Sequence, residues 1–153
     1  MSRRAQIAMD GEEVAAFLAE QRTVSCATLG RDGWPHLMPL WYVLRDGELW
    51  SWTYARSQKV RNLERDARCT LQVETGTEYV ELRGVMLKCE CRLHRDLETV
   101  AALGAEIAAR YGGGSLTPTL EAAMRAQAAK RVGLQFVVRR VASWDHRKLG
   151  GRY

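Results

Sequence analysis

A cationic turn at residues 56–61 carries the residue types best suited to hold a phosphate. It belongs to the segment Ala55-Arg56-Ser57-Gln58-Lys59-Val60-Arg61-Asn62-Leu63, which follows a short aromatic strand. The pattern predicts a helix over 57–65, whose first turn offers unpaired N–H groups and the positive end of the helix dipole. Ser57, Lys59 and Arg61 add a hydroxyl and two cations there, so we predict a phosphate site. The competing interpretation is a solvated basic helix start.

Composition limits the classes of protein to which the chain can belong. With 153 residues, 46% hydrophobic and 27% charged, it is expected to form one globular domain over 1–153. Met1-Ser2-Arg3-Arg4 leads into no apolar signal segment, and no apolar run has the length of a membrane span. We therefore expect a cytoplasmic protein without a membrane partner.

The positive charge of the chain is local. Its net charge is +5, and most of the excess lies in two clusters, 56–68 and 139–152. Two short basic clusters suit a phosphorylated small ligand better than a nucleic-acid track, and no nucleic-acid-binding motif is present. We expect a small-molecule partner and no nucleic acid.

The chain has no recognisable set of catalytic or metal-binding side chains. The histidines accompany neither a nucleophile motif nor a zinc-type spacing, and are expected at the surface or facing a partner: His36, His94 and His146. The cysteines lie in apolar runs without a CxxC pair, and are expected to be reduced core residues: Cys26, Cys69, Cys89 and Cys91. We predict neither a catalytic side chain nor a metal site.

The first half of the chain predicts a helix and a meander of strands. Asp10-Gly11-Glu12-Glu13 has the capping-box pattern of a helix that ends near Arg22. Strands are expected over 23–29, 35–44 and 49–53. Residues 35–44 are apolar on both faces, which predicts cover on both sides, from a second subunit or a ligand. Pro39 within that strand indicates a sheet edge or an interruption.

The second half predicts a long hairpin, two helices and a last strand. The hairpin joins 69–74 to 79–95, and a change in apolar parity predicts a bulge or a sharp bend at Arg83-Gly84. Helices are expected over 97–111, ended by Gly112-Gly113-Gly114, and over 117–131, then a strand over 133–141 and a polar tail over 143–153. This order predicts a mainly β protein, a small antiparallel barrel with peripheral helices.

Aromatic residues flank the cationic turn. Trp50 and Trp52 share one face of a strand, where they could be core or interface anchors. Beside a phosphate site they could equally form a slot for a flat ring system. A bound cofactor would then perform the redox step while the protein supplies orientation and electrostatics.

The chain resembles the pyridoxamine-5′-phosphate-oxidase-like split β-barrel superfamily, whose members bind FMN or the deazaflavin coenzyme F420. Within it, the chain is more similar to the F420-dependent reductases than to the true oxidases. Four segments carry the resemblance: Asp32-Gly33-Trp34-Pro35-His36-Leu37-Met38-Pro39-Leu40-Trp41-Tyr42, Ser57-Gln58-Lys59-Val60-Arg61-Asn62-Leu63, Glu81-Leu82-Arg83-Gly84, and Ser143-Trp144-Asp145-His146-Arg147-Lys148-Leu149. The chain departs from the true oxidases at 148–153, which lack their Arg-Leu-x-Pro-type ending, and this argues against vitamin B6 oxidation.

The resemblance implies a homodimer of Greek-key-like split barrels with two cofactor sites at the subunit interface. The cofactor would be F420, or alternatively FMN. The residues that match cofactor-binding segments of the family are Ser57, Gln58, Lys59, Arg61 and Asn62 of the turn, Trp52, Thr53, Tyr54, Met38, Pro39 and Leu40 of the neighbouring strands, and Trp144 and Lys148 of the tail.

Three functions remain open from the sequence. The first is hydride transfer from reduced F420 to an unsaturated small organic acceptor. The second is an FMN-dependent oxidoreductase that uses the same site. The third is a non-catalytic protein that binds a flavin or a tetrapyrrole.

Overall fold

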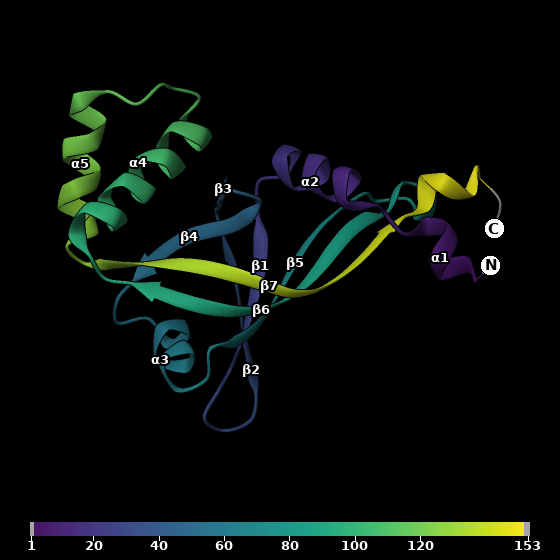
Figure 1. Ribbon diagram of the computed structural model, residues 1–153, viewed down its shortest axis with the longest axis horizontal. Coiled ribbons are helices and arrows are strands. Elements are labelled where there is room, and N and C mark those ends of the chain that lie inside the picture. The colour runs from purple at the N-terminus through teal and green to yellow at the C-terminus, as the bar shows by residue number, and fades with distance from the viewer. Residues whose placement is uncertain (1, 152–153) are drawn as a thin grey trace.

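An antiparallel sheet with strand order β2-β1-β5-β6-β7-β4-β3 organises the computed structural model, which describes residues 2–151 (Figure 1). The helices and short 3₁₀ turns (η) lie around this sheet. In chain order the elements are α1 (Arg3–Ile7), α2 (Gly11–Glu20), β1 (Val24–Leu29), β2 (Pro35–Leu40), β3 (Val43–Arg45), β4 (Glu48–Tyr54), α3 (Gln58–Arg65), β5 (Arg68–Thr75), η1 (Tyr79–Glu81), β6 (Arg83–His94), α4 (Leu97–Gly112), α5 (Pro118–Ala128), β7 (Arg131–Asp145) and η2 (His146–Leu149).

The sheet curves into a half-barrel, as the predicted split barrel requires. The long strands β6 and β7 cross the molecule side by side, with α4 and α5 at one end and α1 and η2 at the other (Figure 1). The helix α3 lies below the sheet, where it contacts β1 and β6. Among residues 2–151, no helix is long and apolar enough to cross a membrane.

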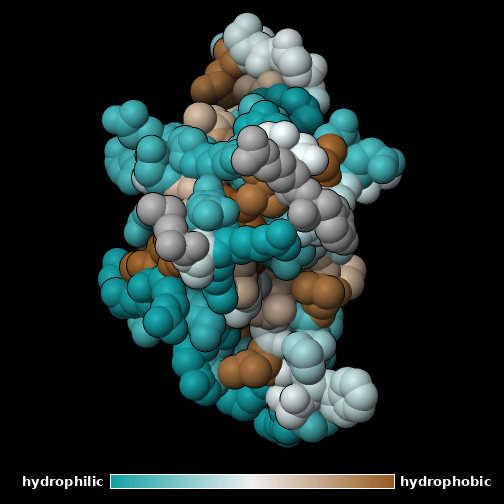
Figure 2. Space-filling model, turned by 90° about the vertical axis from the view of Figure 1, so that its right-hand side faces the viewer, coloured by the Kyte–Doolittle hydropathy of each residue, from teal (hydrophilic) through white to brown (hydrophobic). Residues whose placement is uncertain are grey.

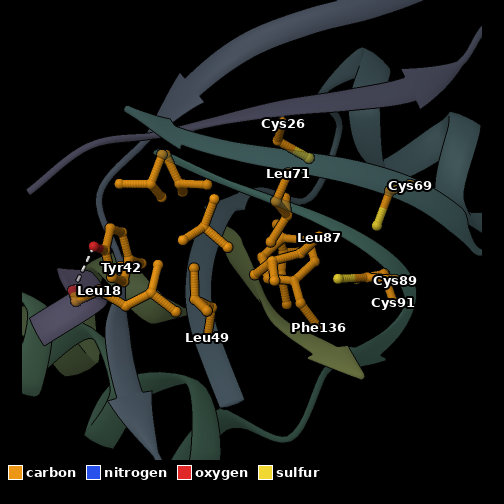
Figure 3. Close-up of a cluster of buried hydrophobic side chains, with 14 of the residues drawn as sticks. Leu18, Cys26, Tyr42, Leu49, Cys69, Leu71, Leu87, Cys89, Cys91 and Phe136 are labelled. Atoms are coloured by element: carbon orange, nitrogen blue, oxygen red, sulfur yellow. Dashed lines mark hydrogen bonds between the residues drawn. The ribbon is translucent and has the colours of Figure 1, made fainter. Parts of the chain in front are cut away.

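The core lies inside the half-barrel and includes all four cysteines. Apolar side chains of the sheet and of α2 meet there, among them Leu18, Tyr42, Leu49, Leu71, Leu87 and Phe136 (Figure 3). Cys26, Cys69, Cys89 and Cys91 are buried in the same cluster, as the sequence predicts, and are free thiols. Burial raises the pKa of the Cys89 thiol to about 12. The described residues contain no group of His, Cys, Asp and Glu placed to hold a metal ion.

The predicted capping box at the start of α2 is present. The backbone N–H of Glu13 donates to Asp10 Oδ1 at 2.9 Å, and the backbone N–H of Asp10 donates to Glu13 Oε2 at 2.8 Å. The two side chains thereby satisfy N–H groups that the helix leaves unpaired. The helix ends at Glu20, two residues before the predicted end at Arg22.

The predicted strand over 35–44 is wrong in its continuity, because it breaks into β2 and β3. Between them Tyr42 turns inward, where its hydroxyl donates to Leu18 O at 2.6 Å (Figure 3). The Tyr42 N–H donates to the Tyr111 hydroxyl at 2.9 Å, in place of a ladder partner. This contact from α4 stabilises the break and cannot be read from the local pattern. Pro39 does lie on an edge strand, since β2 is the outermost strand of the sheet.

Of the bulge or sharp bend predicted at Arg83-Gly84, the structure has no bulge. Tyr79–Glu81 forms η1 rather than the start of a strand, so the apolar parity of 79–82 belongs to a different backbone conformation. The strand β6 begins at Arg83 and pairs regularly there. The register shift lies further along, beside Lys88 and Cys89, where β7 carries one extra residue.

The last strand is longer than predicted. It runs over Arg131–Asp145 rather than 133–141, so Trp144 belongs to β7 and not to a polar tail. Trp144 pairs with Gly84, where an added Cβ would lie 2.1 Å from Trp144 Cζ2.

The helix α5 ends at Ala128, three residues before its predicted end. Of the tail predicted over 143–153, residues 152–153 lie outside the described part.

Candidate functional site

A pocket of about 700 Å³ opens at the end of β4, between the sheet and the helices α4 and α5. We call it the β4-end pocket. It brings together six of the predicted site residues: Pro39, Leu40, Trp52, Thr53, Tyr54 and Lys59. The rest of its wall comes from Thr23, Trp41, Gly104, Ile107, Ala108, Met124 and Arg131.

Lys59 reaches the pocket from the first turn of α3. It is 5% exposed, and its Nζ lies 3.4 Å from Thr53 Oγ1. That separation allows only a weak hydrogen bond. Burial lowers the pKa of the Lys59 ammonium, against a smaller opposing effect of Cys26. Lys59 is therefore a buried cation with little compensation, and the interpretation as a solvated helix start does not apply to this residue.

Arg131, the first residue of β7, supplies a second cation that the sequence analysis missed. It pairs with Tyr54 across the sheet, and its guanidinium carbon lies 4.1 Å from the Tyr54 ring centre and 4.5 Å from that of Trp52. Its Nε is buried and lacks a hydrogen-bond partner in the described structure. Only the strand pairing places Arg131 beside these rings, so the local sequence carried no signal for it.

Trp50 and Trp52 lie on the face of β4 that packs against α4. Both contact the apolar cluster of Val43, Leu103 and Ile107. Their interpretation as packing anchors therefore holds, and Trp52 additionally forms a wall of the β4-end pocket. Thr53, which alternates with them along the strand, is buried on the opposite face, where Lys59 approaches it.

The remaining residues of the cationic turn have different environments. Ser57 precedes α3, and its Oγ is buried without a hydrogen-bond partner among residues 2–151. Asn62 is fully buried and donates from Nδ2 to Thr28 Oγ1 at 3.0 Å, which ties α3 to β1. Gln58 donates to Asn62 Oδ1 at 2.9 Å. Arg61 is exposed on α3.

Seven of the predicted site residues do not line the β4-end pocket: Ser57, Gln58, Arg61 and Asn62 of the turn, and Met38, Trp144 and Lys148. Met38 is 46% exposed on β2. Trp144 and Lys148 belong to the opposite end of the molecule, where Lys148 Nζ donates to Ala8 O at 2.8 Å and to Glu13 Oε2 at 2.6 Å. This end carries both termini and shows mostly hydrophilic side chains with separate apolar spots (Figure 2). A role for these two residues in a partner's site stays a prediction.

The pocket is suited to a flat ligand that carries negative charge. It combines aromatic walls with two cations, and none of the described residues lining it is acidic. The Arg131 guanidinium, which has no carboxylate partner among the described residues, and the weakly bonded Lys59 ammonium leave positive charge in the pocket that an anion can balance. A phosphorylated ring cofactor fits this set of donors and walls, which contains no general acid–base pair.

Comparisons with known proteins agree with the fold. A conserved hypothetical protein from Mycobacterium tuberculosis, Rv2991, is 40% identical, with a TM-score of 0.92 over 100% of this chain and 95% of that one. A structure described as an F420 reductase shares 20% identity over 82% and 93% of the chains, with a TM-score of 0.65. HutZ, described as the heme storage protein of Vibrio cholerae, shares 14% identity over 86% and 92%, with a TM-score of 0.67.

A match to a protein family covers most of the chain. No match is found among curated proteins. Residues 11–145 match the family described as pyridoxamine 5′-phosphate oxidase. This range includes the whole sheet, the cationic turn and every residue of the β4-end pocket. The predicted resemblance is confirmed: the chain belongs to the pyridoxamine 5′-phosphate oxidase family and its superfamily of split β-barrels.

Proposed function

We propose that the protein is an oxidoreductase that binds coenzyme F420 and transfers a hydride from it to an unsaturated small organic acceptor. The single observation that carries this proposal is the β4-end pocket, in which a buried, weakly bonded ammonium lies beside aromatic walls. The similarity to an F420 reductase supports the choice of the deazaflavin. FMN in the same site is the alternative.

Each part of the pocket has a distinct role in this proposal. Lys59 and the first turn of α3 bind the phosphate, since charge-assisted hydrogen bonds there replace lost hydration. Pro39, Leu40 and Trp41 border the ring and keep water from it. The chain positions ring and acceptor in contact, at about 3–3.5 Å, which is the main protein contribution to such a reaction. When bound, reduced F420 supplies the hydride, and the acceptor also takes up a proton from water.

We further propose that the protein acts as a homodimer through β2. Apolar side chains on and beside this edge strand are exposed in the protomer, with Leu37 at 64%, Trp41 at 56% and Trp34 at 76%. Because apolar patches of this kind mark interaction sites, a second copy of the chain would cover them. That arrangement also matches the apolar character of both faces of β2.

Cofactor titration tests the proposed function. Purified protein is titrated separately with F420, FMN and hemin, with binding followed by fluorescence and absorbance. We expect F420 to bind saturably. Lys59→Met should raise the dissociation constant about tenfold to a hundredfold, which corresponds to the loss of one charge-assisted hydrogen bond. Reduced F420 should then be oxidised when an unsaturated acceptor is added.

The control is Arg56→Met, which removes an exposed cation of the same turn. It should leave F420 binding nearly unchanged. Binding of FMN but not F420 would replace the proposed cofactor by the alternative. Tight binding of hemin or a flavin without turnover would instead favour a storage or carrier protein.

A further inference from the structure

We propose that Arg131 forms a second anion subsite in the β4-end pocket, and that this subsite binds the carboxylate of a planar unsaturated acceptor. The identification of the ligand as a hydride acceptor rests on the proposed function, but binding of a carboxylate at Arg131 can be tested without a cofactor. It assigns a substrate class to the pocket: small aromatic or conjugated acids rather than neutral compounds.

Two cations meet this pocket from opposite faces of one strand. Lys59 approaches Thr53, whose side chain points to the barrel side of β4. Arg131 lies against Trp52 and Tyr54, whose side chains alternate with Thr53 and therefore point to the other face. Each cation therefore has its own immediate neighbours, Thr53 for Lys59 and the two aromatic rings for Arg131. The pocket thus offers two positions at which negative charge can bind.

Arg131 has the properties of a prepared binding group rather than of a structural ion pair. No described acidic residue pairs with it, whereas other arginines of the chain have carboxylate partners, such as Arg45 with Glu106 at 2.6 Å. Its Nε is buried and unpartnered. The rings of Trp52 and Tyr54 hold the guanidinium by cation–π contacts, which do not use its hydrogen-bond donors.

The shape of the wall selects a planar ligand. Tyr54 is 56% exposed beside the guanidinium, and Met124, Ile107 and Ala108 continue the surface from the helices. A carboxylate matches the guanidinium fork in a bidentate way, and a flat conjugated body can lie along the apolar wall. Gly104 keeps this side of the pocket open because a larger residue there would displace Trp52.

Matched probes test the subsite in the cofactor-free protein. Calorimetric titrations compare trans-cinnamate with cinnamamide, its neutral analogue of nearly equal shape. We expect cinnamate to bind at least tenfold more tightly. Arg131→Met, which retains length and apolar contact, should reduce cinnamate affinity about tenfold or more and leave cinnamamide affinity unchanged. Arg131→Lys should retain only part of the cinnamate affinity, because the point charge of an ammonium does not reproduce the two parallel donors of a guanidinium.

The control variant separates this subsite from the cofactor site. Lys59→Met should lose F420 affinity and retain most of the cinnamate affinity. Arg131→Met should lose cinnamate affinity and retain most of the F420 affinity. Equal affinity for the two probes, or no binding of cinnamate at millimolar concentration, would overturn the proposal. So would a loss of F420 affinity in Arg131→Met comparable to that in Lys59→Met, since the anion would then belong to the cofactor. Thermal melts of both variants confirm that each protein is folded.

Discussion

Gly104 of α4 packs directly against the indole of Trp52 on β4. A Cβ atom added to Gly104 would lie 2.3 Å from Cζ3 and 2.5 Å from Cη2 of that ring. Helix and strand therefore approach each other only because this residue lacks a side chain, although glycine is a poor helix former. The contact fixes Trp52 as both a packing anchor and a wall of the β4-end pocket.

Gly104→Ala is therefore expected to destabilise the fold and to disturb the pocket. Displacing a packed ring costs about 1–3 kcal/mol, which exceeds the gain of nearly 1 kcal/mol in helix propensity. Denaturant unfolding gives the stability, and F420 titration gives the affinity, which should fall. Gly112→Ala in the last turn of α4 is the control, because no atom lies within 4 Å of its added Cβ. Equal effects of the two substitutions would contradict the importance of the Trp52 contact.

Lys59→Met should stabilise the cofactor-free protein while weakening cofactor binding. Methionine keeps the apolar stem but removes a buried charge whose only hydrogen bond among residues 2–151, to Thr53, is long. We expect a gain of about 1–2 kcal/mol, or an increase of roughly 2–8 °C in melting temperature. Differential scanning fluorimetry without ligand measures it. If Lys59 were an exposed residue of a solvated helix start, its substitution would hardly change the stability. An unchanged melting temperature would therefore contradict the role of Lys59 as a destabilising buried charge.

The affinity for a phosphorylated cofactor should fall at alkaline pH. Burial lowers the pKa of Lys59 from its ordinary 10.5 in the free protein, and a bound phosphate favours the charged form. Below the lowered pKa, Lys59 is charged and the cofactor binds with full affinity. The affinity decreases as the pH rises through this pKa, because Lys59 of the cofactor-free protein is then neutral. Dissociation constants measured from pH 7 to pH 10 follow this loss. In Lys59→Met the slope should disappear; a slope that persists would point to another titrating group.

The same pKa shift determines how stability depends on pH. A lysine whose pKa is lower in the folded than in the unfolded protein destabilises the fold at neutral pH. This cost decreases as the pH rises from the folded pKa toward 10.5, the unfolded value. The stability advantage of Lys59→Met should therefore be largest near neutral pH and smaller near pH 10. Denaturant midpoints of both proteins at the two pH values measure the difference.

The sequence predicts those features that local patterns determine. Alternating apolar residues give the strands, and the Asp10–Glu13 pair gives the start of α2, because cap and partner are three residues apart. Features that depend on contacts between residues far apart in the sequence cannot be predicted in this way. The break at Tyr42 requires Tyr111, which is 69 residues away, and the anion subsite requires Arg131 to pair with Tyr54. The burial of Lys59 likewise depends on how α3 packs against the sheet, where it contacts β1 and β6.

Tyr111→Phe should destabilise the protein through the break between β2 and β3. The substitution preserves the stacking of Tyr111 on Trp41, whose ring centres are 4.4 Å apart, but removes the hydroxyl that accepts from Tyr42 N–H. A part-buried N–H left without its partner costs about 1–3 kcal/mol. Urea unfolding measures the loss. Tyr54→Phe is the control, since its exposed hydroxyl has no described hydrogen bond; a comparable loss there would contradict the assigned role of Tyr111.

Leu37→Asp should convert the proposed homodimer into a monomer. Leu37 lies in the middle of the edge strand β2 and is 64% exposed in the protomer, so a charge there costs little in the monomer. In a dimer that covers β2, the same carboxylate would be buried without a partner, which opposes association. Light scattering at micromolar concentration measures the mass. Leu116→Asp, 49% exposed in the loop before α5, adds the same charge elsewhere and should leave the dimer intact. A wild-type monomer, or a Leu37→Asp dimer of undiminished stability, would exclude β2 as the interface.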